Sequence, residues 1–253
     1  WRLRRSVIAS GAGPGATDLI TLRGARWLGK ADVVLFDALT DPELRDMAPQ
    51  AEWIDVGKRG YAHAMAQERI NALLVEHGSR SDIAVVARLK GGDPNLFGRL
   101  EEELIALDQA GISCEVVPGV TSAIAAAAGT HRPLTRRGVG RSVSFATAMT
   151  RSGEVQGCRS ADTEVFYMAG QKLAILAEQL LQVGWSVETP VLLVSDAGTR
   201  QEQASETTVG RLASAGERHA GRPTIVIVGA GARPVLARDA VVGNLLPPSG
   251  AAA

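Results

Sequence analysis

The sequence predicts an α/β protein of two domains, each a mainly parallel or mixed sheet flanked by helices. In the first half, short apolar runs alternate with segments of helical spacing, and these runs lack the alternation typical of a half-exposed strand. After residues 131–141, which are rich in arginine, glycine and proline, strands outnumber helices. We therefore expect a first domain over residues 1–132, a linker over 133–141 and a second domain over 142–253.

The first domain shows five apolar runs and five segments of helical spacing. The strands are expected at residues 6–10, 32–37, 51–57, 83–89 and 114–119. The helices are expected at residues 18–30, 41–48, 64–77, 96–111 and 121–129. Asp41 and Pro42 are typical of a helix start, and Gly78 and Gly111 of a helix end.

The second domain is expected to contain fewer helices. Its strands are expected at residues 142–148, 164–170, 190–198, 203–210 and 223–231, and its helices at 171–183 and 211–218. The tail at residues 244–253 is expected to be disordered at its end.

The composition limits the classes of partner and function that the chain can have. Lys plus Arg equals Asp plus Glu at 27 each, which gives no indication of nucleic acid or a membrane surface as partner. No apolar run approaches the roughly 18 residues that span a bilayer.

Cys114 and Cys158 lie in no metal-ligand spacing, so we expect no metal site. Two isolated cysteines also suit a reducing cytoplasm, where we expect the protein to work. The start shows no secretory pattern, and Trp1 in place of methionine suggests that residues upstream are missing.

Two glycine-rich turns follow strands, at residues 11–16 and 91–94. Glycine lets a backbone approach a ligand closely, and open α/β sheets bind ligands at the carboxyl ends of their strands. The first turn also fits a loose dinucleotide pattern, although Pro14 lacks the N–H that would hold a pyrophosphate. A tight turn without chemical use is the other interpretation.

Longer motifs in the sequence indicate a particular protein family more specifically than the two short glycine-rich turns do. They are GAGPG at residues 11–15, VGKRGYAH at 56–63, RLKGGDPNLFGR at 88–99, VPGVTSA at 117–123, PLTRRG at 133–138 and FYMAG at 166–170. In this order and over nearly the whole length, the chain resembles the uroporphyrinogen-III C-methyltransferases of the tetrapyrrole methylase superfamily.

This resemblance implies a homodimer of two-domain chains with the active site in the cleft between the domains. It implies two methylations of uroporphyrinogen III by S-adenosylmethionine, giving precorrin-2 for sirohaem, cobalamin or haem d1 synthesis, with S-adenosylhomocysteine as by-product. The implied cofactor contacts are Pro14, Gly91, Gly92, Asp93, Leu96, Thr121, Ser122, Met168 and Gly198. Asp37 and Lys58 match the proposed acid and base, and Arg99, Glu102 and Arg137 match positions for substrate handling or catalysis.

The residue types suit this chemistry, but each has a plain structural alternative. A carboxylate-rich substrate requires cations, and arginine binds carboxylate with two parallel hydrogen bonds. Four arginines crowd the interdomain segment, namely Arg132, Arg136, Arg137 and Arg141; the alternative is a solvated hinge. The alternatives are a turn residue for Asp37, a surface side chain for Lys58, core packing for Met168 and helix-dipole stabilisation for Glu102.

Several positions depart from the family pattern. They are Ala16, Asn95, Leu100, Glu101, Arg136 and Met149. These departures leave two alternatives open. One is a methylase of the same fold that acts on another precorrin or a different substrate, and the other is a binding protein without turnover.

Overall fold

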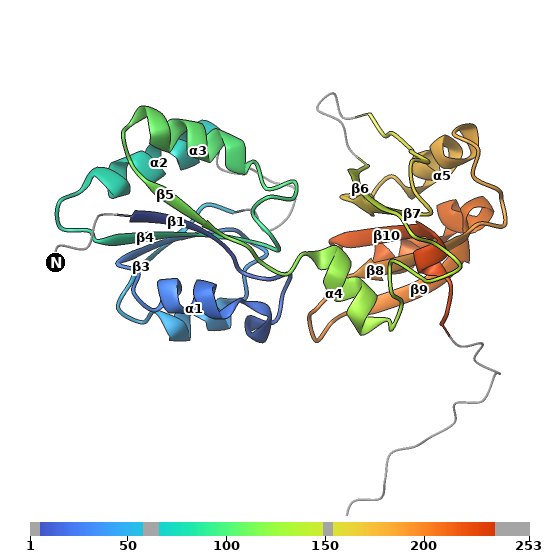
Figure 1. Cartoon of the computed structure of the whole chain (residues 1–253), viewed down its shortest axis with the longest axis horizontal. Helices are drawn as coiled ribbons and strands as arrows, with labels where there is room; N and C mark the ends of the chain where they lie inside the picture. Colours follow the sequence, from blue (N-terminus) through green and yellow to red (C-terminus); the bar gives the residue numbers. More distant parts are fainter. Residues whose placement is uncertain (1–5, 58–65, 149–153, 236–253) are drawn as a thin grey trace, which may run out of the picture.

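The structure is a computed structural model that describes residues 6–57, 66–148 and 154–235. It contains two five-stranded sheets, one from each half of the chain (Figure 1). The first sheet is parallel, with the strand order β3-β2-β4-β1-β5. Its strands are β1 (Ser6–Gly11), β2 (Val33–Phe36), β3 (Glu52–Asp55), β4 (Val85–Lys90) and β5 (Cys114–Val117).

Helices cover both faces of this sheet. They are the α-helices α1 (Leu22–Leu28), α2 (Gln67–Ser79) and α3 (Leu100–Gln109) and the 3-10 helices η1 (Thr17–Leu19) and η2 (Pro42–Met47). Ile8 and Ala87 pack with α1 and η2, whereas Val7 and Val86 pack with α2 and α3. Figure 1 shows α1 below the sheet and α2 and α3 above it. Because both faces are covered, the strands stay apolar without alternation, as the sequence showed.

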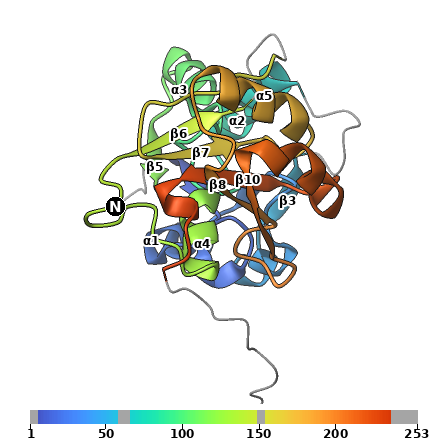
Figure 2. The same cartoon turned by 90° about the vertical axis from the view of Figure 1, so that its right-hand side faces the viewer.

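The second sheet is mixed. Its strands are β6 (Val143–Thr147), β7 (Thr163–Tyr167), β8 (Pro190–Ser195), β9 (Gln203–Thr208) and β10 (Thr224–Gly229), in the order β6-β7-β10-β8-β9. Only the β6–β7 pair is parallel. One face carries α4 (Ser122–Gly129), and the other carries α5 (Leu173–Gln182) and the 3-10 helix η3 (Val209–His219). Figure 2 shows α4 and α5 on opposite sides of these strands. A short 3-10 helix, η4 (Ala230–Ala232), follows β10. The predicted fold class is confirmed.

The helix α4 packs with the second sheet although it precedes the predicted linker. Ala123 and Ala126 are buried with Val165 and Ile227 in one core cluster. The chain therefore passes between the sheets at residues 118–121, between β5 and α4 (Figure 1). The domain limits at residues 132 and 141 stay a prediction about folding units, and this packing favours a division before α4.

Several helices differ from their predicted extent. The predicted helix over residues 18–30 is interrupted, because Thr21 caps a new start at α1 with Oγ1 accepting from Gly24 N at 3.1 Å. Residues 41–48 form the 3-10 helix η2, where Asp41 Oδ1 caps Glu43 N at 2.9 Å as expected. Gly78 does not end α2 but lies inside it, where a Cβ would come within 3.2 Å of a β1 side chain.

Two further helices were predicted with the wrong bounds or type. The helix predicted over residues 96–111 starts only at Leu100, because Phe97 and Arg99 adopt left-handed backbone conformations. The predicted helix over 211–218 is the 3-10 helix η3. Residues 244–253 lie outside the described residues.

Within the described ranges, none of the helices combines the length and apolar character needed to cross a membrane.

Candidate functional site

Three glycines meet where adjacent parallel strands end. Gly11 ends β1, Gly92 follows β4 and Gly119 follows β5. The backbones touch: Gly92 N donates to Gly13 O at 2.7 Å, and a Cβ on Gly11 would lie 2.5 Å from Gly119 Cα. Gly13 and Gly92 have φ of 79° and 77°, which glycine adopts without strain. The three backbones therefore pack in direct contact, and this contact fixes the position of the turn Gly91–Gly92.

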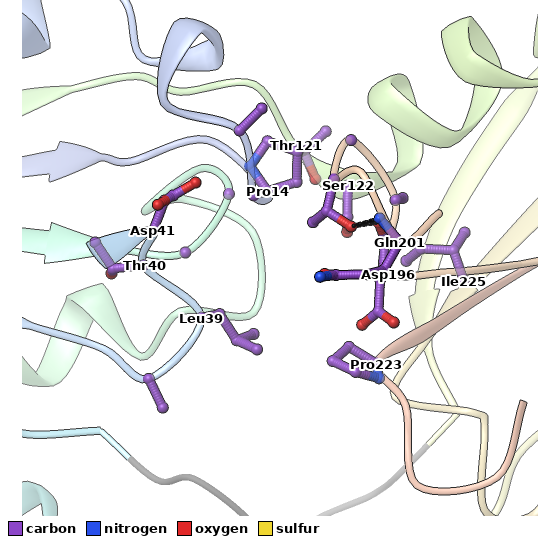
Figure 3. Close-up of a pocket in the computed structure, with 18 of the residues that line it drawn as sticks. Pro14, Leu39, Thr40, Asp41, Thr121, Ser122, Asp196, Gln201, Pro223 and Ile225 are labelled. Atoms are coloured by element: carbon purple, nitrogen blue, oxygen red, sulfur yellow. Dashed lines mark hydrogen bonds between the residues drawn. The ribbon is translucent and has the colours of Figure 1, made fainter. Parts of the chain in front are cut away.

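Gly91 and Gly92 line a cavity of about 1060 Å³ with walls from both halves of the chain. Figure 3 shows Leu39, Thr40 and Asp41 on one side, facing Asp196 and Pro223 on the other across open space. The structure brings all nine predicted cofactor residues to this cavity. They are Pro14, Gly91, Gly92, Asp93, Leu96, Thr121, Ser122, Met168 and Gly198.

Polar side chains fix the loops around the cavity. Asp93 Oδ2 accepts from Gly119 N at 2.8 Å, and Oδ1 accepts from the backbone and side-chain nitrogens of Asn95, both at 2.8 Å. Oδ1 thus caps the turn that follows Asp93, and the same carboxylate places negative charge at the cavity. Thr121 Oγ1 lies 2.7 Å from Tyr167 Oη. Burial raises the pKa of Tyr167, so its hydroxyl stays neutral near pH 7.

Strained backbone is concentrated at the same place. Phe97, Met168 and Asp196 line the cavity with φ of 54°, 58° and 48°, in the left-handed region that non-glycine residues rarely adopt. Phe97 packs on Tyr167 across the two halves, with ring centroids 4.9 Å apart. Met168 is 55% exposed, so the core-packing alternative for this residue is wrong. Strain of this kind tends to persist at binding sites.

Of the predicted catalytic residues, Asp37, Arg99 and Glu102 are close in sequence to the residues that line the cavity but do not line it themselves. Asp37 follows β2, directly before the lining residues 38–43, and its Oδ1 accepts from Arg88 Nη2 at 2.6 Å. Arg99 and Glu102 form a two-bond ion pair at the start of α3, with both N–O distances 2.7 Å. Lys58 lies outside the described residues.

The arginine-rich segment does not line this cavity, and the expectation of an arginine-lined cleft is wrong for the single chain. Thr163 Oγ1 donates to Leu134 O at 2.8 Å, which fixes the segment to the start of β7. The cavity lies at the other end of that strand, at Tyr167, roughly 13 Å away at about 3.3 Å per residue. Arg137 is exposed there.

The neighbouring arginines of this segment have structural partners. Arg132 is buried and pairs with Glu206, and Arg136 donates to the carbonyl oxygens of Arg233 and Pro234. Both side chains thereby hold the end of the second sheet together.

Sequence reasoning missed a buried charged network under the second glycine turn. Arg88 and Lys90 of β4 both bind Glu103 of α3, with N–O distances of 3.0 and 2.7 Å. Burial and the charge of Arg88 lower the pKa of Lys90, and Glu103 opposes this shift. Two cations at alternate positions of an otherwise apolar strand were the signal that could have indicated it. Arg200, a further cation, lines the cavity and was also missed.

Fold and site together define a class: two-sheet α/β proteins that bind a small molecule between the sheets, at the carboxyl ends of parallel strands. The particular family follows from comparison. Residues 7–213 match the model of the Tetrapyrrole (Corrin/Porphyrin) Methylases, and the chain belongs to this family.

Individual relatives agree with this assignment. The chain is 38% identical over 234 residues to a uroporphyrinogen-III C-methyltransferase of Cyanidium caldarium, covering 89% of this chain and 92% of that protein. It is 42% identical over 230 residues to a siroheme synthase of Pseudomonas paraeruginosa, covering 88% of this chain but only 49% of that longer protein. The crystal structure of a uroporphyrin-III C-methyl transferase from Thermus thermophilus, complexed with S-adenyl homocysteine, matches with a TM-score of 0.76 and 34% identity, covering 88% and 97% of the two chains.

Proposed function

We propose that this chain transfers methyl groups from S-adenosylmethionine to uroporphyrinogen III, twice, giving precorrin-2 for sirohaem, cobalamin or haem d1 synthesis. The observation that carries the proposal is the single cavity that gathers all nine expected cofactor residues from both halves of the chain. The names of the relatives support the same reaction and the same methyl donor.

The cavity fits S-adenosylmethionine. Its floor is glycine backbone: a Cβ on Gly91 would lie 3.0 Å from Leu39 Cβ, so larger residues would fill the space. Asp93 supplies negative charge for a cationic sulfonium, and exposed Met168 supplies a soft apolar contact. When bound, the cofactor supplies an electrophilic methyl group. The residues of the chain then have to align the acceptor carbon with that group, which can supply much of the rate enhancement.

The remaining roles concern the acceptor. A proton has to leave the tetrapyrrole after each methyl transfer, and we propose Asp37 and Lys58 as the acid and base for this step, a contribution of about 10²–10⁴-fold. We propose that Arg99, oriented by Glu102, binds substrate carboxylates. Arg137 lies at the far end of β7, so its predicted role in substrate handling requires a second copy of the chain or a movement of residues 133–141.

We also propose a homodimer that works in the cytoplasm. A second hollow of about 1460 Å³ on the α4 side of the second sheet is bordered by partly exposed apolar residues, among them Ile124, Phe145 and Val235. Apolar surface of this kind marks interaction sites. Both cysteines are free thiols, which suits a reducing compartment. Sedimentation equilibrium at micromolar concentration tests the assembly, and a monomer there contradicts it.

The reaction is tested with the purified chain, uroporphyrinogen III under reducing anaerobic conditions, and S-adenosylmethionine labelled in its methyl group. We expect two labelled methyl groups in each tetrapyrrole, detected by mass spectrometry after oxidation. Calorimetric binding of both ligands without label transfer would instead support a binding protein. Transfer to another precorrin alone would support a methylase of different substrate.

A further inference from the structure

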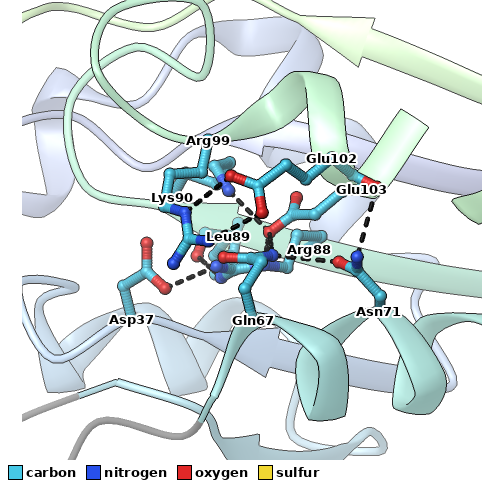
Figure 4. A network of polar contacts seen from close by, with 9 residues as sticks. All are labelled: Asp37, Gln67, Asn71, Arg88, Leu89, Lys90, Arg99, Glu102 and Glu103. Carbon is cyan, nitrogen blue, oxygen red and sulfur yellow. Dashed lines mark hydrogen bonds and ion pairs between the residues drawn. The ribbon is translucent and has the colours of Figure 1, made fainter. Parts of the chain in front are cut away.

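The face of β4 that points toward α2 and α3 carries two buried cations. The side chains of Arg88 and Lys90 are 3% and 2% exposed, and they share one face because strand residues alternate. Burying a charge is strongly unfavourable unless it is paired and hydrogen-bonded. The network in Figure 4 supplies those partners, and Lys90 in this network directly precedes the glycine turn Gly91–Gly92 of the cavity.

Glu103 is the common partner in this network. Its side chain is 2% exposed, and Oε1 accepts from Arg88 Nε at 3.0 Å, Lys90 Nζ at 2.7 Å and Gln67 Nε2 at 3.3 Å. Its Oε2 has no hydrogen-bond partner among the described residues. One carboxylate oxygen of α3 therefore connects the strand that carries the glycine turn to the first residue of α2.

Arg88 connects Glu103 to Asp37 and so restricts the orientation of the Asp37 side chain. Its guanidinium is held on three sides, by Glu103 at Nε, by Leu89 O at 2.8 Å from Nη1 and by Asp37 Oδ1 at 2.6 Å from Nη2. A guanidinium with these contacts is a fixed part of the protein rather than a free substrate ligand. The other oxygen of Asp37 points away from Arg88 (Figure 4), and the Asp37 side chain is 30% exposed.

Lys90 extends the network to the cofactor turn. A Cβ on Gly98 would lie 3.1 Å from Lys90 Cε, so the lysine stem supports the loop that continues from Gly91 and Gly92. The first turn of α3 is connected to the network as well, because Asn71 Nδ2 donates to Glu102 O at 3.2 Å and Asn71 Oδ1 accepts from Gln67 Nε2 at 3.0 Å.

We infer that Glu103 is a positioning residue for the reaction. It is not among the residues that line the cavity, and it fixes the Asp37 carboxylate through Arg88, so that this carboxylate takes part in the proton transfer after methylation in a constant orientation. This inference rests on the proposed function, since it assigns Asp37 to that proton transfer. The net charge of Asp37, Arg88, Lys90 and Glu103 is zero, so neutralising Glu103 leaves one uncompensated cation beside Asp37.

The test is a double-mutant cycle of Glu103→Gln and Asp37→Asn, with kcat, KM for S-adenosylmethionine and S-adenosylhomocysteine affinity measured for each variant. The substitution E103Q keeps the shape of the side chain. We expect it to lower kcat by about 10–100-fold, the scale of a small misplacement of a reacting group. S-adenosylhomocysteine affinity should change by less than about threefold, because the turn itself stays intact. In the D37N background the further loss from E103Q should be below about threefold, since its effect runs through Asp37.

The matched control is Glu115→Gln, the same substitution on β5 at a side chain that accepts from Trp27 Nε1 at 3.2 Å. It should leave kcat within about twofold of the wild type, as expected for a site outside the network. Equal losses from E103Q in the wild-type and D37N backgrounds would overturn the inference, as would wild-type kcat in folded E103Q. An inactive wild type would instead reject the proposed function and not the positioning.

If E103Q melts below the assay temperature, Arg88→Lys replaces it in the same cycle. Lysine keeps the buried positive charge but cannot reach Glu103 and Asp37 together through a planar fork. A loss of about tenfold or more in kcat that disappears in the D37N background supports the chain of contacts. A loss that persists at full size in that background contradicts it.

Discussion

His219 is a buried polar residue whose protonation state the surroundings control. Its side chain is fully buried at the end of η3, with Nδ1 2.6 Å from Ser195 Oγ, and Nε2 has no hydrogen-bond partner among the described residues. Burial lowers the pKa of His219, and the charges of Arg222 and Arg218 lower it further. The native protein therefore holds a neutral imidazole that joins η3 to β8.

The lowered pKa predicts a loss of stability in acid. His219 in the unfolded chain takes up a proton near pH 6.5, whereas His219 in the native chain takes one up only at lower pH. The free energy of unfolding is therefore highest above pH 6.5 and decreases as pH falls toward the native pKa. The decrease is about 1.4 kcal/mol for each unit by which the native pKa lies below 6.5. His219→Asn keeps a hydrogen bond to Ser195 but does not titrate. Urea unfolding at pH 7.5, 6 and 5 should show a steeper decline for the wild type than for H219N; identical declines would refute this.

Single residues also show which features of the site can be predicted from the sequence and which cannot. The glycine turn at Gly91 and Gly92 follows from local chemistry, and the structure has it, with Gly92 at a positive φ. The exposure of Met168 and the position of Arg137 depend on how distant strands pair, and local patterns carry no such information. The partners of Asp37 likewise come from β4, 51 positions further along the chain.

At the scale of elements, the strands were predicted better than the helices. All ten strands overlap the predicted strand segments. The signal is strongest where burial on both faces leaves an apolar run, as in β2 and β10, and weakest for the polar edge strand β9. Helix ends depend on hydrogen bonds and contacts that spacing does not reveal. Thr21 starts α1 by capping Gly24, and Gly78 lies inside α2 at a point where an added Cβ would be 3.2 Å from the Val7 side chain of β1.

The strands β1, β4 and β5 meet at three glycines, and this contact predicts how a single added methyl group, in Gly119→Ala, affects stability and ligand binding. In Gly119→Ala the added Cβ would collide with Gly92 O and lie 2.8 Å from Gly11 Cα, both backbone atoms that cannot rotate away. We expect a loss of about 1–3 kcal/mol in the free energy of unfolding, typical of overpacking. The displaced turn should also weaken S-adenosylhomocysteine binding in calorimetry.

Gly29→Ala is the control for this element. Its φ is −63°, and the nearest atoms to an added Cβ lie 3.5 Å away. The free energy of unfolding of G29A should stay within about 0.5 kcal/mol of the wild type, or rise slightly because alanine restricts the unfolded chain. Equal stability and equal affinity in the two variants would mean that the contact among the three backbones does not position the glycine turn of the cavity.

For the whole molecule, the position of the cavity predicts that one ligand stabilises both halves. The walls come from residues 38–43 of the first half and residues 196–201 of the second. A ligand that binds only the native chain adds about 2.7 kcal/mol at one hundred times its Kd. At about 2–4 °C per kcal/mol for a chain of this size, S-adenosylhomocysteine should raise Tm by roughly 5–10 °C.

Hydrogen exchange then locates this stabilisation. Amides of β4 in the first sheet and of β10 in the second should both exchange more slowly with the ligand, because opening either half breaks the cavity. NAD serves as the comparison ligand. The Gly11–Ala16 turn leads into η1, and α1 starts later at its own cap Thr21, so the chain lacks the turn-to-helix geometry that binds a pyrophosphate. An equal Tm shift with NAD, or protection confined to β4, would show that the two halves do not share one ligand.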